Sequence, residues 1–112
     1  MNSSRHATRA DAADIIDRGW IPTILPESST DIRESHNVDT NRGHGTFVFG
    51  PDDIAEFRSS LRAVAPTESL LRSLIPREEF EQRGYVFYRY EDFDIAVHWQ
   101  TRRGQFWLTY LR

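Results

Sequence analysis

The chain has 112 residues, the length of one ordinary domain, and this length predicts a single domain over residues 1–112. Hydrophobic residues make up 38% and charged residues 28%, which is typical of a soluble globular protein and excludes a disordered chain. Cysteine and lysine are absent, so disulfides, thiolate chemistry and Schiff-base chemistry are excluded. The formal net charge of -3 argues against a nucleic-acid-binding protein.

The N-terminal residues contain no long apolar run. A secretory leader needs about 7–15 apolar residues, and a membrane helix needs about 20. Neither is present, so the protein is expected to be soluble as written and to reach a membrane only through a leader that this sequence does not contain. Residues 1–7 are expected to form a flexible tail.

The first predicted element is a helix over residues 7–18, where alanines and isoleucines form an apolar stripe that ends at Gly19. The two prolines of residues 20–26 predict an extended segment or a single turn. Residues 31–38 then alternate, with one side carrying Ile32, Glu34, His36 and Val38 and the other Arg33, Ser35 and Asn37. Residues 46–49 resume this pattern after a stretch rich in turn formers. The two segments predict a β-hairpin.

A second helix is predicted from Pro51 to Val64, because Ile54, Phe57, Leu61 and Val64 recur at helical spacing. Residues 69–75 are expected to be a helical turn or a loop with buried leucines. Strands are then predicted at residues 85–90, 93–100 and 105–111, and their short connections indicate an antiparallel meander. The predicted fold class is α+β, with two layers, a mostly antiparallel five-stranded sheet and helices on one face. The expected buried set includes Phe57, Leu61, Ile95, Val97 and Leu108.

One run of the N-terminal third resembles a small bacterial protein family. The matching residues are Arg18-Gly19-Trp20-Ile21-Pro22, Leu25-Pro26 and Asp31-Ile32-Arg33-Glu34-Ser35-His36-Asn37-Val38-Asp39-Thr40-Asn41. They fit that family's pattern of GW-P-LP followed by I-E-H-DTN. Family members often begin with a membrane helix or a lipoprotein-type leader, so the resemblance implies an extracytoplasmic location. It implies no activity and no cofactor.

His36, Asp39, Asn41 and His44 lie within nine residues around the predicted turn. Imidazole with carboxylate would suit a divalent metal or acid–base chemistry. The H-x-x-D-x-x-x-x-H spacing matches no metal motif of known mechanism, however, and short polar side chains commonly bond their own turn backbone. An EF-hand is excluded because its sixth and twelfth positions would be His44 and Gly50. The sequence therefore predicts no metal ligand, no cofactor and no catalytic residue.

The C-terminal meander carries more aromatic residues than one buried sheet face requires. Two explanations stay open: a surface for a partner, or cover of the second face by the segment around Trp20. On the first explanation, the predicted binding residues are Tyr85, Phe87, Arg89 and Trp107. His98 is expected on the face opposite Ile95 and Val97, as an exposed polar residue.

These observations predict a non-enzymatic binding or interaction domain that presents an aromatic sheet face. Its partner would be an unknown protein or a second copy of the chain, and not nucleic acid. The alternative is a small metal-dependent or His/Asp hydrolase that uses the loop of His36, Asp39 and His44.

Overall fold

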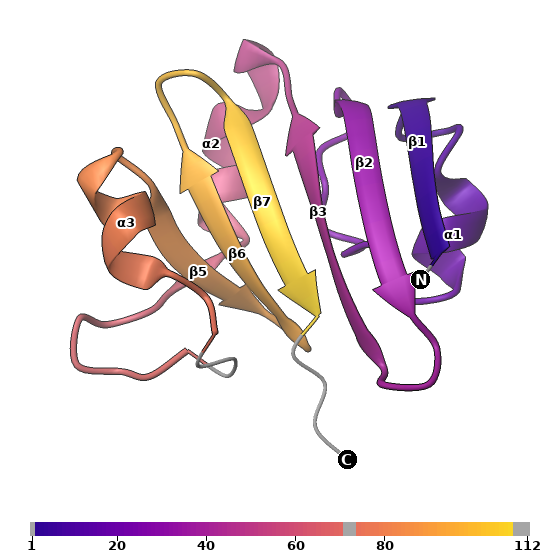
Figure 1. Cartoon of the computed structure of the whole chain (residues 1–112). Helices are drawn as coiled ribbons and strands as arrows, with labels where there is room; N and C mark the ends of the chain where they lie inside the picture. The colour runs from indigo at the N-terminus through magenta and orange to yellow at the C-terminus, as the bar shows by residue number, and fades with distance from the viewer. Residues whose placement is uncertain (1, 71–73, 109–112) are drawn as a thin grey trace.

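Within residues 2–70 and 74–108, which the computed structural model describes, seven strands form one antiparallel sheet (Figure 1). The sheet order is β1-β2-β3-β7-β6-β5-β4. The strands are β1 (Asn2–Thr8), β2 (Thr30–Asn37), β3 (Arg42–Val48), β4 (Arg62–Ala63), β5 (Val86–Tyr90), β6 (Phe93–His98) and β7 (Arg103–Leu108). The helical elements are α1 (Ala13–Asp17), the 3-10 turn η1 (Pro51–Asp53), α2 (Ile54–Ser59) and α3 (Arg77–Gln82).

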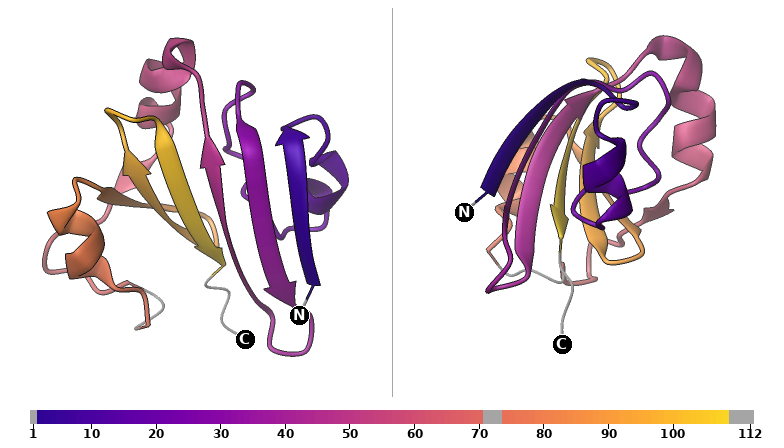
Figure 2. Two further views of the ribbon diagram at one scale, coloured as in Figure 1. Left: turned by 45° about the horizontal axis from the view of Figure 1, so that its top comes forward. Right: turned by 90° about the vertical axis from the view of Figure 1, so that its right-hand side faces the viewer.

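The predicted five-stranded α+β fold with helices on one face is wrong. The sheet has seven strands, each α-helix has only five or six residues, and α3 lies on the face opposite α1 and α2 (Figures 1 and 2). The protein is therefore mostly β. The two additional strands escaped prediction because β4 has only two residues and β1 is almost entirely polar, so neither shows an apolar alternation.

The expected N-terminal tail is a strand. Residues 2–8 pair with β2 in a register that runs from Asn2 opposite His36 to Thr8 opposite Thr30. The helix expected over residues 7–18 begins only at Ala13, because Thr8 still belongs to the sheet and the backbone N–H of Arg9 donates to the carbonyl of Ser29. Backbone pairing overrides the helix propensity of the alanines here.

The predicted hairpin and meander are confirmed, as β2–β3 and β5–β6–β7. The helix predicted from Pro51 is shorter than expected, since η1 and α2 end at Ser59 and β4 follows. Of the leucines expected to be buried in residues 69–75, Leu70 is half-buried and Leu74 is exposed, and residues 71–73 lie outside the described part of the chain. None of the helices within the described ranges is long and apolar enough to cross a membrane.

The main core lies on one side of the sheet, called here the first face. Side chains from α1, α2 and the segment 20–26 pack on it against the strands, so the segment around Trp20 covers this face and not the second one. Phe57, Ile95, Val97 and Leu108 are buried there as predicted, whereas Leu61 is half-buried.

Two phenylalanine–glycine pairs join the N-terminal hairpin to the meander. Phe47 on β3 lies opposite Gly104 on β7, and Gly45 on β3 lies opposite Phe106 on β7. A Cβ on either glycine would come within 2.3 Å of the facing ring, so only glycine fits below these rings. Both phenylalanines are buried, and this junction makes one continuous core from the two halves of the chain.

The second face is divided into two halves (Figure 1). Over β5 to β7 it is covered by residues 64–70 and 74–82, the covering segment, which includes α3. The buried members of the cluster beneath it are Val64, Ile75, Phe80, Phe87, Ala96 and Trp107. Over β1 to β3 and the adjoining side of β7, no described element lies above the strands (Figure 2). We call these two regions the covered half and the open half.

Candidate functional site

The predicted aromatic surface lies inside the covered half. Phe87 and Trp107 are 2% and 7% exposed, and the ring of Phe80 on α3 contacts both at centroid distances of 6.0 Å and 5.4 Å. Tyr85 is half-buried and meets Phe80 edge-on at 5.1 Å. The aromatic surplus is thus explained by a second core under α3, and Phe87 and Trp107 are not available to a partner in this conformation.

Arg89, one of the predicted binding residues, holds the covering segment to the sheet. Its Nε donates to the buried carboxylate of Asp94 at 3.0 Å, and its Nη1 donates to Glu68 at 2.7 Å. Arg77, the first residue of α3, adds bonds to the carbonyls of Val64 and Glu68 at 3.3 Å and 2.8 Å. A hydrogen bond from Arg62 lowers the pKa of the Glu68 carboxyl from its ordinary value. These arginines hold the loop and α3 in place.

The residues of the predicted hydrolase loop point in different directions. His36 is buried on the first face, His44 is exposed on the second face, and Asp39 is exposed in the turn between their strands. Asn37, rather than Asp39, supports this turn, because its Oδ1 accepts from the backbone N–H of Asp39 and of Thr40. The expectation that a short polar side chain bonds the backbone of this turn therefore applies to Asn37. The three residues cannot act on one substrate group or hold one metal ion together.

His36 belongs instead to a buried polar network between β1 and β2. Its Nδ1 lies 2.6 Å and 2.9 Å from the two oxygens of Glu34, which is only 2% exposed. Ser4 donates to the same carboxylate at 3.3 Å, and His6 lies 2.9 Å from the Ser4 hydroxyl. Trp20 stacks on the His36 ring at 4.1 Å. This network pairs the polar strand β1 with β2 and gives the Trp, Glu and His of the N-terminal sequence pattern a structural role.

The remaining histidine and the acidic side chains give no support to metal chemistry. Across the described ranges, no group of three or more histidine, aspartate or glutamate side chains is arranged to hold a metal ion. His98 lies on the face opposite Ile95 and Val97, as predicted, but it is half-buried and not exposed, because its ring contacts that of Tyr85 at a centroid distance of 5.3 Å. It serves the β6–β7 turn, since its Nδ1 accepts from the backbone N–H of Thr101 at 3.2 Å.

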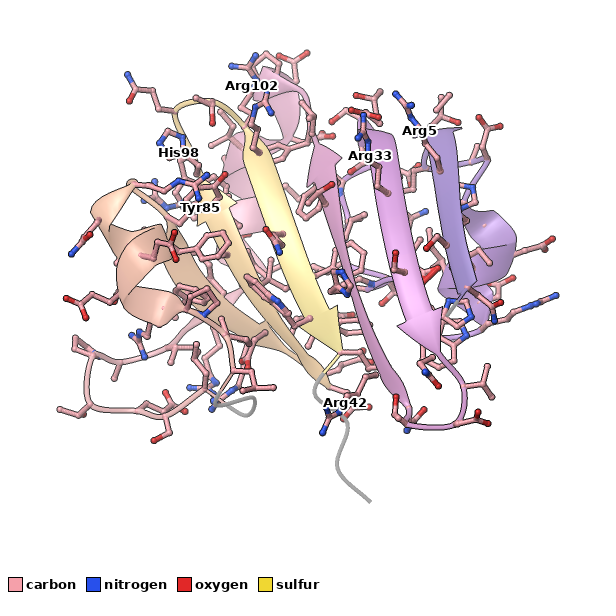
Figure 3. All side chains as sticks on the ribbon, viewed as in Figure 1. Arg5, Arg33, Arg42, Tyr85, His98 and Arg102 are labelled. Carbon is pink, nitrogen blue, oxygen red and sulfur yellow. The ribbon has the colours of Figure 1, made fainter. Side chains whose placement is uncertain are left out.

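The open half is polar and carries four arginines. Strand register places their side chains and the neighbouring polar ones on the second face (Figure 3). The set comprises Ser3, Arg5, Arg33, Ser35, Asn37, Arg42, His44, Thr46, Arg103 and Gln105. Asp31 is the one acidic side chain that binds these arginines among the described residues, and its Oδ1 lies 3.3 Å from Arg5 and 3.4 Å from Arg33. The open half is therefore basic although the whole chain has a net charge of -3.

A shallow groove of about 240 Å³ crosses the open half near its boundary with the covered half. Arg33 and Arg103 line it together with Thr46, Gln105 and Tyr85, and the carboxylate of Asp31, which pairs with Arg33, lines it as well. Arg33, Thr46 and Gln105 are direct neighbours across three strands. Apart from Asp31, these polar side chains can donate hydrogen bonds, so the groove offers donors to a carboxylate or another anionic group beside that one acidic residue.

The sequence pattern does not reveal this basic surface. The pattern places Arg33 on the side of its strand opposite Ile32 and Glu34, but it places Arg5 in a tail and Arg42 and Arg103 in turns.

The fold and its open half define a mostly β domain with a basic, uncovered sheet surface. Residues 2–48 match the family model of the YbbD head domain, which supports the resemblance to a small family noted for the N-terminal third. The match covers less than half of the chain and includes β1, β2 and β3 together with α1. Neither the curated proteins nor the solved structures contain a match to this chain.

Proposed function

We propose that this protein is a non-enzymatic binding domain that engages an acidic protein partner through the open half of its second face. The observation that carries the proposal is an exposed, arginine-bearing sheet surface on a chain whose overall charge is negative. Exposed charge of one sign, gathered on one surface, steers and orients a partner of the opposite sign. This proposal replaces the aromatic face with the open half as the contact surface.

The arrangement of the arginines suits carboxylates on a partner. Arg5 and Arg33 are paired neighbours on β1 and β2, and adjacent strands lie about 4.8 Å apart. Planar guanidinium groups at that spacing can each donate two hydrogen bonds to a carboxylate in a bidentate geometry. Ser35, Thr46 and Gln105 supply neutral hydrogen-bonding groups beside them. Such a surface can read a row of acidic side chains on an extended segment or a helix.

The geometry gives less support to a hydrolase. The loop of His36, Asp39 and His44 places its two imidazoles on opposite faces of the sheet, and His36 already bonds the buried carboxylate of Glu34. A general base needs hydrogen-bond reach to a shared reacting group, and these residues do not converge on one.

A labelled poly-glutamate peptide tests the proposal. Fluorescence anisotropy at low ionic strength should detect binding to the wild-type protein, and added salt should weaken it. The double charge reversal Arg5→Glu with Arg33→Glu should raise the dissociation constant by about tenfold or more, which corresponds to about 1.4 kcal/mol. Arg18→Glu, an exposed change at the end of α1 behind the sheet, is the matched control and should bind like the wild type.

Two results would contradict the proposal. One is an equal loss of binding in the Arg18→Glu control and in the double variant. The other is tighter binding of an oligodeoxythymidylate of the same charge, which would favour a nucleic-acid partner instead.

A further inference from the structure

The two halves of the second face differ in height as well as in charge. The covering segment adds a layer above β5 and β6, and the open half beside it is bare sheet (Figures 1 and 2). The covering segment is thus a ridge, and the open half is the lower surface beside it. A surface with this shape can fit a rotated copy of itself. A two-fold contact requires such self-complementarity, because each subunit presents the same patch.

The outer surface of the ridge is acidic. Phe80 points from α3 into the cluster below. Glu78, two positions earlier, therefore lies on the opposite side of the helix, and Glu79 lies on its flank. Glu78 and Glu79 are exposed, and neither forms an ion pair within residues 2–70 and 74–108. Glu81 pairs with Arg77 at 3.4 Å. The ridge therefore presents exposed carboxylates a short distance from the exposed guanidinium groups of the open half.

We infer that the acidic partner of the open half is α3 of a second copy of this chain, in a face-to-face two-fold dimer. The inference rests on the proposed function, whose surface it uses, and it names the partner. The sheet order provides the geometry: β5 and β2 each lie two strands from β7. A two-fold axis parallel to β7 therefore places β5 of one copy over β2 of the other. Because α3 packs on β5, it then lies over Arg33 of the other copy.

The charges make the contact reciprocal. Each dimer forms two equivalent contacts, in which Glu78 and Glu79 of one copy face Arg5 and Arg33 of the other. Because both sides of each contact are exposed in the monomer, the attraction is electrostatic and should weaken as salt rises. A closed two-fold pair uses both ridges and both open halves, so assembly stops at two copies.

Charge-reversal variants test the dimer by sedimentation equilibrium over a wide range of protein concentrations. The wild type should reach twice its monomer mass of 13.1 kDa at low ionic strength. Arg5→Glu with Arg33→Glu should be monomeric, and so should Glu78→Arg with Glu79→Arg, each with a dimer dissociation constant raised about tenfold or more. A mixture of the two should form a heterodimer, because both variants then meet a surface of opposite charge. Far-ultraviolet circular dichroism checks that each variant is folded.

The controls lie on α1, on the far side of the sheet: Arg18→Glu and Asp17→Arg should dimerise like the wild type. A wild-type protein that remains monomeric at every concentration would overturn the inference, and so would a mixture of folded variants that does not associate. If poly-glutamate still binds while no dimer forms, the dimer is wrong and the proposed function stands. If neither occurs, both fail.

Discussion

The covered and open halves of the second face use the same residue type for different purposes. Arg89 and Arg33 both project from the second face, and each binds an aspartate through its Nε. Arg89 is 13% exposed and its partner Asp94 is fully buried, whereas the side chains of Arg33 and Asp31 are about half exposed. One arginine holds a loop to the sheet, and the other remains available to a partner. The environment above the strand decides which role an arginine has.

The boundary between the halves falls within a single row of side chains. From β1 to β5 this row runs Arg5, Arg33, Thr46, Gln105, Ala96 and Phe87. Polar groups give way to apolar ones between β7 and β6, where the covering segment begins. A small alanine beside Phe87 leaves room for Phe80 of α3 to reach the sheet. The row thus changes from an exposed polar surface to a buried core without a break in the strand pairing.

The largest expected effect is at the covered half. Phe80→Ala removes the aromatic side chain that joins α3 to Phe87 and Trp107, and should lower the free energy of unfolding by about 3–5 kcal/mol. Thr46→Ala on the open half should change it by no more than about 0.5 kcal/mol. Urea denaturation measures both. Equal effects of the two substitutions would mean that the halves do not differ in packing.

The comparison of Arg89 with Arg33 predicts a smaller effect on the free energy of unfolding. Arg89→Met leaves the buried carboxylate of Asp94 without its bond to the guanidinium and should cost about 3 kcal/mol of unfolding free energy. Arg33→Met loses only an exposed pair, worth less than about 1 kcal/mol. Thermal or urea unfolding of the two variants at the same pH gives the contrast. If the Arg89→Met variant were the more stable of the two, the assigned roles would have to be exchanged.

The smallest expected effect is the pH dependence of the stability that Glu68 contributes. Because the pKa of Glu68 is lowered in the folded protein, chiefly by the hydrogen bond from Arg62, its carboxylate stabilises the fold above its unfolded-state pKa. This contribution is lost as pH falls through the folded-state pKa. The stability difference between wild type and Glu68→Gln should therefore be present at neutral pH and vanish in acid. Glu79→Gln, which removes an exposed carboxylate, should show no such dependence, and a constant Glu68→Gln difference would disprove the linkage.

The sequence contained enough information for the apolar strands. Ile95, Val97 and their neighbours alternate clearly, and so do Ile32, Glu34 and His36, so the meander and the hairpin could be placed with the correct faces. The position of the covering segment could not be predicted, since its contacts join Phe80 to strands that follow it and Arg77 to carbonyls before it. Without that segment, the aromatic surplus is equally consistent with an exposed surface.

Strand β1 shows a different limit of prediction from the sequence. One side-chain hydrogen bond from β1 reaches the buried Glu34, which the pattern placed on one side of its strand together with His36. A buried carboxylate requires partners, and the partner Ser4 lies thirty residues earlier in a segment without apolar residues at regular spacing. Polar pairing of this kind leaves no periodic signal, and the basic surface that includes Arg5 was missed for the same reason.

The central place of β7 affects how the chain folds. β7 is the last of the described strands to be synthesised, yet it is the fourth of seven in the sheet and pairs with β3, where His44 meets Trp107 more than half the chain length away. Until β7 is available, no strand joins the β2–β3 hairpin to the β5–β6 pair in the sheet, and Phe47 has no Gly104 to pack against. Non-local pairing of this kind raises the contact order and slows folding. The nascent chain therefore exposes apolar strand surface for longer than a domain with local strand pairing would, and this domain is expected to fold only after β7 has been synthesised.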